Sequence, residues 1–288
     1  MALVVLPAVP DVKADLLKAL GTSFGRKGAP GGLPEVTAVV RDVTQDRERL
    51  AGYDRVCGFR LRDQVSATWL HVLTFPLQTH LMARRDFPFP LPGVLHVSNS
   101  MTQYRPVLVS ERLDLSVRAA DLAAHRRGVA FDFLAEIHSA GELVWQGSTR
   151  YLAPGAPMDG LPPVSVDERD FPVVEGTRVW RLPADLGRQY ARVSKDANPI
   201  HTSTLAAKAL GLPRTIIHGM WTHAAMLAAL DQRLPDAFTV DVRFTKPVLL
   251  PSKVRFGQRA EDGGWWQAVT TVDGLKPFVL AHIQPLKS

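Results

Sequence analysis

The feature that most constrains the fold is an internal repeat, because two similar stretches of one chain adopt similar structures. The string WLHVLTFPLQTHLMA at Trp69–Ala83 aligns without a gap with IIHGMWTHAAMLAAL at Ile216–Leu230. Further along each half, YRPVLVSERLDLSVR at Tyr104–Arg118 aligns with TKPVLLPSKVRFGQR at Thr245–Arg259. The chain is therefore predicted to contain the same structural unit twice.

Each copy combines one apolar helix with a series of short strands. A helix that is apolar nearly all round is expected to be buried. Closely spaced strands with short turns are typical of an antiparallel sheet. Four are expected in each half, at residues 94–104, 112–120, 129–138 and 143–152, and at 240–244, 253–259, 265–272 and 278–283. A buried helix wrapped by an antiparallel sheet is the hot-dog arrangement, so the sequence predicts an α+β double hot dog.

Proline and glycine mark the division between the two halves. The stretch APGAPMDGLPPVSVDERD at Ala153–Asp170 contains four prolines and two glycines. Such a segment supports neither a long helix nor a central strand. We therefore expect an N-terminal domain at 1–152, a linker at 153–170 and a C-terminal domain at 171–288.

Composition narrows the class of protein. The chain has 288 residues, which is enough for two modest domains. Its one cysteine, Cys57, excludes an intramolecular disulfide framework and a multi-cysteine zinc site, and it fits a reducing, cytoplasmic setting. No apolar run is long enough to span a bilayer, and the N-terminal segment lacks the features of a signal peptide.

The net charge of +6 suits an anionic partner. A phosphorylated cofactor, an acidic carrier protein and nucleic acid all fit this balance, and so does solubility alone. Nucleic acid is disfavoured because lysine and arginine look scattered rather than clustered along the chain.

The second half contains the motif YARVSKDANPIHTS at Tyr190–Ser203, which the first half lacks. A short helix over 183–193 must end before Pro199, because proline pushes the preceding Asn198 into extended geometry. Asp196 and His201 are then held close together on a fixed bend, a pairing that suits acid–base chemistry. Gly219, where the apolar helix begins, is able to offer a bare backbone N–H to a developing negative charge.

The same residues also have plainer interpretations. Asp196 and Asn198 are common turn residues, and His201 could simply lie at a helix start. We expect His218 to be a core histidine that serves packing or hydrogen bonding, because its repeat partner His71 lies in the half without the motif. No pair of histidines is spaced for zinc, so no metal site is expected.

The segment from Tyr190 to Met226 resembles the signature of the MaoC-like dehydratases, which include the (R)-specific enoyl-CoA hydratases. That pattern reads roughly Y-x-x-x-S-G-D-x-N-P-I-H, followed by an alanine-rich helix and I-x-H-G-M. The resemblance covers about 40 residues closely, and the repeat extends it loosely over most of the chain. In the two-hot-dog members that this layout resembles, the N-terminal half is degenerate.

The resemblance implies a role for each matched residue. Asp196 and His201 would be the catalytic pair that activates water, and Asn198, Gly219 and Ser194 would bind substrate. The reaction would be reversible addition of water to trans-2-enoyl thioesters to give (3R)-3-hydroxyacyl thioesters in fatty-acid metabolism. The substrate would be an acyl-CoA or an acyl carrier protein thioester, with no metal or other cofactor. Apart from the resemblance, the composition predicts a cytoplasmic protein that binds no nucleic acid. Dimers are common on general grounds, so a homodimer is expected, although a double hot dog can also satisfy its pairing within one chain.

One position departs from the pattern, and two other functions share the fold. Lys195 stands where the family usually has glycine, so we expect ordinary backbone angles there and either a solvent-exposed side chain or one that reaches the ligand's phosphate end. The alternative functions are an acyl-CoA thioesterase and a non-catalytic protein that binds acyl thioesters. The Asp/His loop favours the hydratase over both.

Overall fold

The computed structural model describes residues 2–22, 32–91, 93–157, 159–164 and 170–286. The described residues form two compact units, and neither is continuous in sequence. The first unit consists of Met1–Thr44, Leu70–Asn99 and Ser110–Glu168, and the second of Gln45–Trp69, Ser100–Val109 and Arg169–Ser288.

These units differ from the domains predicted above. The change of unit at residue 169 falls at the end of the predicted linker, part of which lies outside the described residues. Residues 45–69 and 100–109, however, belong to the second unit although they come from the first half of the chain. The reason is packing: helix α2 (Arg47–Cys57) contacts helix α4 (Leu186–Ser194), which a reading by sequence order does not anticipate.

The first unit wraps an antiparallel sheet around helix α3 (Ala67–Met82), of which residues 70–82 belong to this unit. Its strands are β2 (Val36–Val43), β4 (Leu113–His125), β5 (Gly128–Ser139), β6 (Glu142–Pro154) and the first part of β3 (Leu95–Gln103). β1 (Ala2–Val5) pairs in parallel with β2, and α1 (Val12–Thr22) lies between these two strands in the chain. On β4, burial alternates from Leu113 to Ala119, as expected for a strand with one face on a core.

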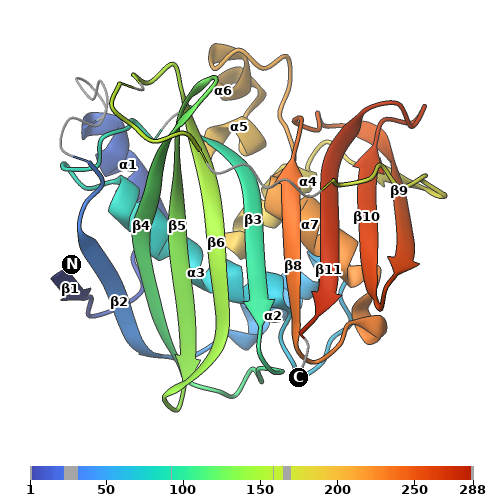
Figure 1. Cartoon of the computed structure of the whole chain (residues 1–288), viewed down its shortest axis with the longest axis horizontal. Coiled ribbons are helices and arrows are strands. Elements are labelled where there is room, and N and C mark those ends of the chain that lie inside the picture. The colour runs from blue at the N-terminus through green and yellow to red at the C-terminus, as the bar shows by residue number, and fades with distance from the viewer. Residues whose placement is uncertain (1, 23–31, 92, 158, 165–169, 287–288) are drawn as a thin grey trace. The chain divides into compact units, whose positions relative to one another are not determined.

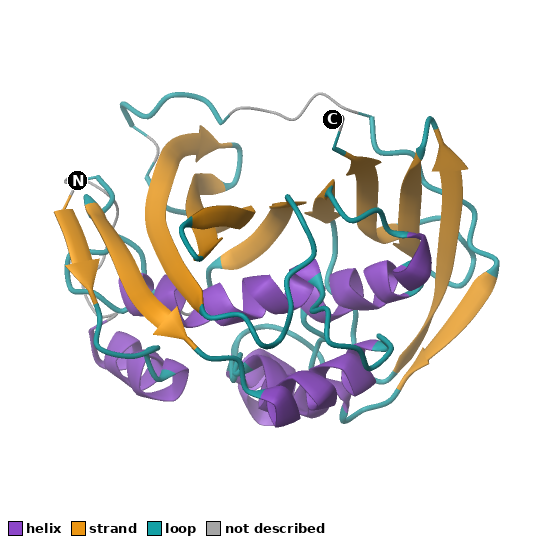
Figure 2. Cartoon of the chain, turned by 90° about the horizontal axis from the view of Figure 1, so that it is seen from below, coloured by secondary structure: helices purple, strands orange, loops and turns teal. Residues whose placement is uncertain are grey.

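The second unit repeats this arrangement around helix α7 (Gly219–Ala228) (Figures 1 and 2). Its strands are β7 (Arg178–Leu182), β8 (Phe238–Phe244), β9 (Ser252–Glu261), β10 (Gly264–Thr270) and β11 (Pro277–Pro285). Short helices α5 (Pro199–Thr202) and α6 (Thr204–Ala209) and the 3₁₀ turn η1 (Asp231–Arg233) complete it. The side-chain amide of Gln267 on β10 donates to the Met226 carbonyl on α7 at 2.8 Å, so the sheet lies directly on the helix.

The strand order confirms the repeat. It runs β2-β4-β5-β6-β3 in the first copy and β7-β9-β10-β11-β8 in the second, so each strand has a counterpart at the same place. The expectation of four strands per copy was incomplete, because β2 and β7 precede the central helices. Both are short segments whose partners, β4 and β9, lie far along the chain, and no local hairpin signal marks them.

The ungapped alignment of the two central helices brings their ends to within one residue of each other, because Met82 at the end of α3 pairs with Ala229, the residue after α7. Their starts differ: α3 begins at Ala67 and contains His71, whereas α7 begins at Gly219, directly after His218. The start of α7 at Gly219 is as predicted. Among the described residues, no helix is long and apolar enough to cross a membrane.

Candidate active site

Helix α4 holds the start of the motif loop, because one face of the helix is buried in the protein and the loop follows directly after its last residue. Leu186, Tyr190 and Ser194 follow one another at intervals of four residues and are buried, while Val193 is only half-buried. The Ser194 hydroxyl accepts a hydrogen bond from the Asp196 backbone N–H at 3.2 Å. Ser194 therefore holds the start of the motif loop from inside the fold.

The backbone at Lys195 corrects one sequence expectation. Lys195 has φ +67° and ψ 1°, the left-handed conformation, and its N–H donates to the Ala191 carbonyl at the end of α4. Ordinary backbone angles were predicted for a lysine, but the position ends a helix in a geometry that glycine adopts at lower cost. The side chain is exposed, as one of the two expectations for it required.

The loop after Lys195 is built from two successive side-chain turns. Asp196 Oδ1 accepts from the Asn198 N–H at 3.2 Å, and Asn198 Oδ1 accepts from the Ile200 N–H at 3.3 Å. Asn198 has φ −53° and ψ 124°, the extended geometry expected before Pro199, and it caps the single turn α5. The turn role and the site role of Asp196 are thus compatible, because Oδ1 holds the loop and Oδ2 remains available.

His201 lies on α5 with its ring orientation fixed by the backbone. Its Nδ1 is 2.9 Å from the Ile216 carbonyl oxygen, which accepts only, so Nδ1 carries the proton. Nε2 is then the nitrogen with a lone pair in the neutral ring. Burial lowers the pKa of His201, and the nearby Asp196 carboxylate opposes that shift. The result is an imidazole that is neutral at neutral pH and ready to accept a proton.

Asp196 shows the complementary shift. Burial raises the pKa of its carboxyl, while His201 and the Asn198 N–H act in the opposite direction. Its side chain is still 27% exposed, so a ligand or water has access to it. The environment therefore moves the pKa values of the acid and the base toward each other, which is typical of groups that exchange protons during a reaction.

His218 completes this cluster, where sequence reasoning expected a core histidine that packs or makes hydrogen bonds but did not place it beside His201. Its ring stacks on that of His201 with 3.6 Å between centroids. Its Nε2–H donates to the Asp196 backbone carbonyl at 3.0 Å and lies 3.8 Å from Asp196 Oδ2. One potential ligand atom from each of Asp196, His201 and His218 lies within 4.8 Å of the others. The signal that sequence reasoning missed is His218's place immediately before the N-terminus of α7.

Gly219 is the first residue of α7, and its neighbours allow no side chain. A Cβ atom there would lie 2.9 Å from two ring carbons of Phe244, closer than real Cβ contacts come. The first N–H groups of a helix have no partner within the helix and carry its partial positive charge. Gly219 therefore begins α7 next to His218 of this cluster, and presentation of its N–H to a ligand stays a prediction.

Residues of α2 contact the helix α4 residues that pack against the cluster. The Tyr190 ring is 4.8 Å from the His218 ring, and Tyr53 of α2 lies 6.0 Å from Tyr190. Arg49 of α2 donates from Nε to the Val193 carbonyl at 2.8 Å. The candidate site thus depends on a helix from the first half of the chain, which the motif alone did not indicate.

The first half has a shortened version of the same connection. Helix α2 ends at Gly58 in the left-handed conformation, as α4 ends at Lys195. Only residues 59–66 then lead to α3, whereas residues 196–218 lead to α7. The stretch equivalent to α5 and α6 is missing, and it is this stretch that carries His201. The first half therefore has no counterpart of the acid–base pair.

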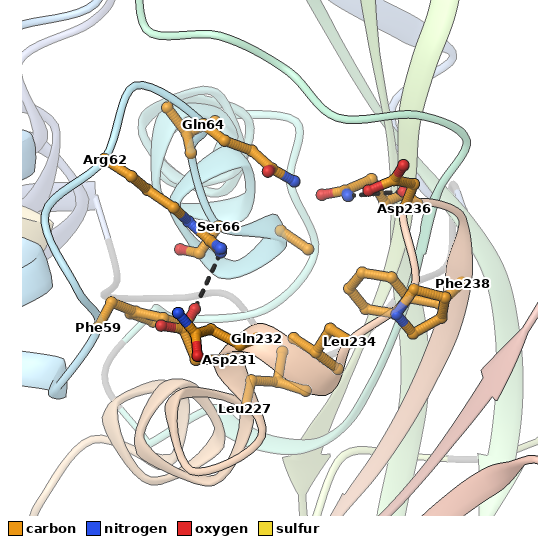
Figure 3. A pocket seen from close by; sticks show the side chains of 14 residues that line it. Phe59, Arg62, Gln64, Ser66, Leu227, Asp231, Gln232, Leu234, Asp236 and Phe238 are labelled. Atoms are coloured by element: carbon orange, nitrogen blue, oxygen red, sulfur yellow. Dashed lines mark hydrogen bonds and ion pairs between the residues drawn. The ribbon is translucent and has the colours of Figure 1, made fainter.

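A cavity of about 360 Å³ lies beside this shortened connection (Figure 3). Arg62 forms an ion pair with Asp231 at 3.0 Å across it, and Leu227 and Leu234 form an apolar wall. Leu227 lies nine residues along the chain from His218, or about 14 Å at the rise of a helix. Neither Asp196 nor His201 lines this cavity, so it is separate from the candidate site.

Comparison with known proteins identifies the family. Residues 154–274 match the MaoC-like domain. The chain is 37% identical over 277 residues to 3-hydroxyacyl-thioester dehydratase X of Mycobacterium tuberculosis, across 96% of this chain and 99% of that protein. The crystal structure of that organism's HtdX matches with a TM-score of 0.77 at 35% identity, covering 87% of this chain and 100% of that one.

Two further comparisons add to this. A stretch of 68 residues is 46% identical to part of fatty acid synthase subunit beta of Aspergillus oryzae, covering 24% of this chain and 3% of that protein. Another Mycobacterium tuberculosis protein, described as having a double hot-dog fold, matches with a TM-score of 0.53 at 13% identity over 86% of this chain and 95% of that one. The fold is therefore a double hot dog. The chain belongs to the MaoC-like dehydratase family, as its motif predicted.

Proposed function

We propose that this protein reversibly adds water to trans-2-enoyl thioesters and so forms (3R)-3-hydroxyacyl thioesters in fatty-acid metabolism. The observation that carries the proposal is the grouping of Asp196, His201 and His218 within 4.8 Å, next to the N-terminus of α7. The dehydratase named in the comparison supports the same reaction class for this chain.

The acid–base pair performs the proton transfers. In the hydration direction, a water molecule held between Asp196 and His201 loses a proton to the pair while its oxygen bonds to C3 of the enoyl group. The electrons of the C2–C3 double bond move toward the thioester and form an enolate. The pair then returns a proton to C2, so the elements of water are added and the pair is regenerated. General acid–base catalysis of this kind contributes about 10²- to 10⁴-fold in rate.

The Gly219 N–H stabilises the charge that develops on the thioester oxygen. The N-terminus of a helix favours negative charge, and a donor of this kind acts most strongly when charge appears during the reaction. Asn198 and Ser194 support this geometry by fixing the loop that carries Asp196. We assign Asn198 and Ser194 to positioning of the site on this basis, and direct contact with substrate stays a prediction.

The reaction as written needs no metal and no other cofactor, since proton transfers complete it. Asp196, His201 and His218 do offer ligand atoms close together, so metal dependence requires its own control. We expect full activity after dialysis against EDTA, and loss of activity that zinc restores would contradict this. We further propose that the acyl group is carried by CoA or by an acidic carrier protein. The protein is proposed to be cytoplasmic, in line with its single buried cysteine, and to form a homodimer.

The assigned roles are tested by two variants of the pair. Asp196→Asn keeps the Oδ1 acceptor that holds the Asn198 N–H, and His201→Ala removes the base. Each variant should lower kcat on crotonyl-CoA by roughly 10²- to 10⁴-fold, with an unchanged melting temperature for Asp196→Asn. Near-normal turnover in both variants would refute the assignment, and release of free thiol from a saturated acyl-CoA would indicate a thioesterase instead.

A further inference from the structure

The excess positive charge of the chain is concentrated in the sequence segment that contains the motif. The whole chain carries 34 basic and 28 acidic residues, a net charge of +6. Between Arg178 and His218 there are seven lysines and arginines but only two acids, Asp185 and Asp196, a net charge of +5. All seven cationic side chains are exposed. This segment therefore carries nearly all of the excess charge, although lysine and arginine look scattered along the chain as a whole.

Three of these cations form a stripe along one face of α4 and its end. Arg188, Arg192 and Lys195 are spaced by four and three residues, so they lie on one side of the helix. The opposite side, with Leu186 and Tyr190, is buried. At a rise of 1.5 Å per residue the stripe is about 10 Å long. Like charges at this spacing repel one another, so the arrangement is best satisfied by an anionic partner.

Exposed leucines lie next in the chain. Leu205 on α6 is 81% exposed and Leu210 at its end is 52% exposed, and Lys208 lies between them. Helix α5 contacts both α4 and α6, so these residues are close to the basic stripe. A rim of charge around exposed apolar side chains is typical of surfaces that bind proteins.

We propose that this α4–α6 surface, defined by Arg188, Arg192, Lys195, Leu205 and Lys208, docks an acidic carrier protein that presents the acyl thioester to Asp196 and His201. The proposal rests on the function proposed above and specifies its partner. A protein is favoured over the nucleotide of CoA for two reasons. A line of cations about 10 Å long matches acidic side chains along a helix better than a compact phosphate group. The exposed leucines also have no counterpart in a phosphate.

The test compares three substrates that share one acyl group. They are trans-2-enoyl thioesters of an acyl carrier protein, of CoA and of N-acetylcysteamine, which has neither phosphate nor protein. The variant is Arg188→Glu/Arg192→Glu. For the carrier protein substrate we expect kcat/KM to fall on the order of 10- to 100-fold and to lose most of its salt dependence. Turnover of the N-acetylcysteamine substrate should not change, and that of the CoA substrate should change much less.

The matched control is Arg126→Glu/Arg127→Glu, which makes the same charge change at two exposed positions in the β4–β5 turn. It should leave all three substrates unaffected. An equal loss for the CoA and carrier protein substrates would overturn the proposal in favour of a phosphate site, and no loss for either would also overturn it. Failure of wild-type protein to hydrate the N-acetylcysteamine substrate would instead count against the proposed function. Titration of the wild type and the variant with the carrier protein then decides the docking proposal by itself.

Discussion

Replacing Gly219 by alanine tests whether the N-terminus of α7 is placed as tightly as the structure shows. The added Cβ would lie 2.9 Å from the Phe244 ring, so either the ring or the helix start has to move. Extra methyl groups in a packed region typically cost about 1–3 kcal/mol. If the helix start moves, its N–H leaves the thioester oxygen, and loss of one such donor lowers kcat by roughly 10²- to 10³-fold.

A second substitution separates the steric effect from a general loss of structure. Phe244→Leu makes room for the new methyl group, so the double variant should regain most of the activity that Gly219→Ala loses. The assays are steady-state hydration of crotonyl-CoA and thermal unfolding of the two single variants and the double variant. Wild-type kcat and stability in Gly219→Ala would refute the close contact with Phe244. A double variant as impaired as Gly219→Ala would show that crowding by Phe244 is not the cause.

Three further predictions concern other residues. The left-handed backbone at Lys195 costs a lysine about 1–2 kcal/mol, which Lys195→Gly removes. Glycine in turn costs about 0.5–1 kcal/mol, because it makes the unfolded chain more flexible. We therefore expect a melting temperature equal to or slightly above that of the wild type, and a clear decrease would contradict the assigned backbone geometry. His218→Phe keeps a ring on His201 but removes the donor to the Asp196 carbonyl, so kcat should fall about 10-fold with little change in KM, and full activity would show that this bond does not position Asp196. Burial lowers the pKa of His71 to about 4, so the unfolded chain binds a proton at this histidine before the folded protein does as the pH falls. The free energy of unfolding should therefore decrease between about pH 6.5 and pH 4, by up to about 1.4 kcal/mol per pH unit. Denaturant titrations of His71→Gln should show a smaller decrease over that range, and an unchanged pH dependence would contradict the prediction.

The repeat and the motif predicted much of this molecule from sequence. The eight strands expected from closely spaced runs with short turns correspond to β3–β6 and β8–β11. The bend at Asn198-Pro199 and the helix start at Gly219 also follow from local rules, because proline geometry and helix capping involve only neighbouring residues. Ser203 caps α6 in the same local way, because its hydroxyl accepts from the Ala206 N–H.

Features that depend on distant contacts were not predictable in this way. The packing of Tyr53 behind Tyr190 joins residues 137 positions apart, and nothing local in either segment indicates the pairing. The place of His218 beside His201 was not predicted, because the alignment equated it with His71, which lies inside α3 instead of directly before a helix. Lys195 adopts left-handed angles because the end of α4 and the loop after it determine the backbone there, overriding the preference of the side chain.

The central claim is that Asp196 and His201 add water to an enoyl thioester, and product analysis tests it most directly. Purified protein is incubated with crotonyl-CoA and with a longer trans-2-enoyl-CoA, with Asp196→Asn as control, and the absorbance of the enoyl group, free thiol and product chirality are measured together. The account predicts loss of enoyl absorbance, a (3R)-3-hydroxyacyl-CoA product, no thiol release, and little reaction by the variant. Formation of the (3S) product, release of thiol, or equal turnover by Asp196→Asn would contradict it.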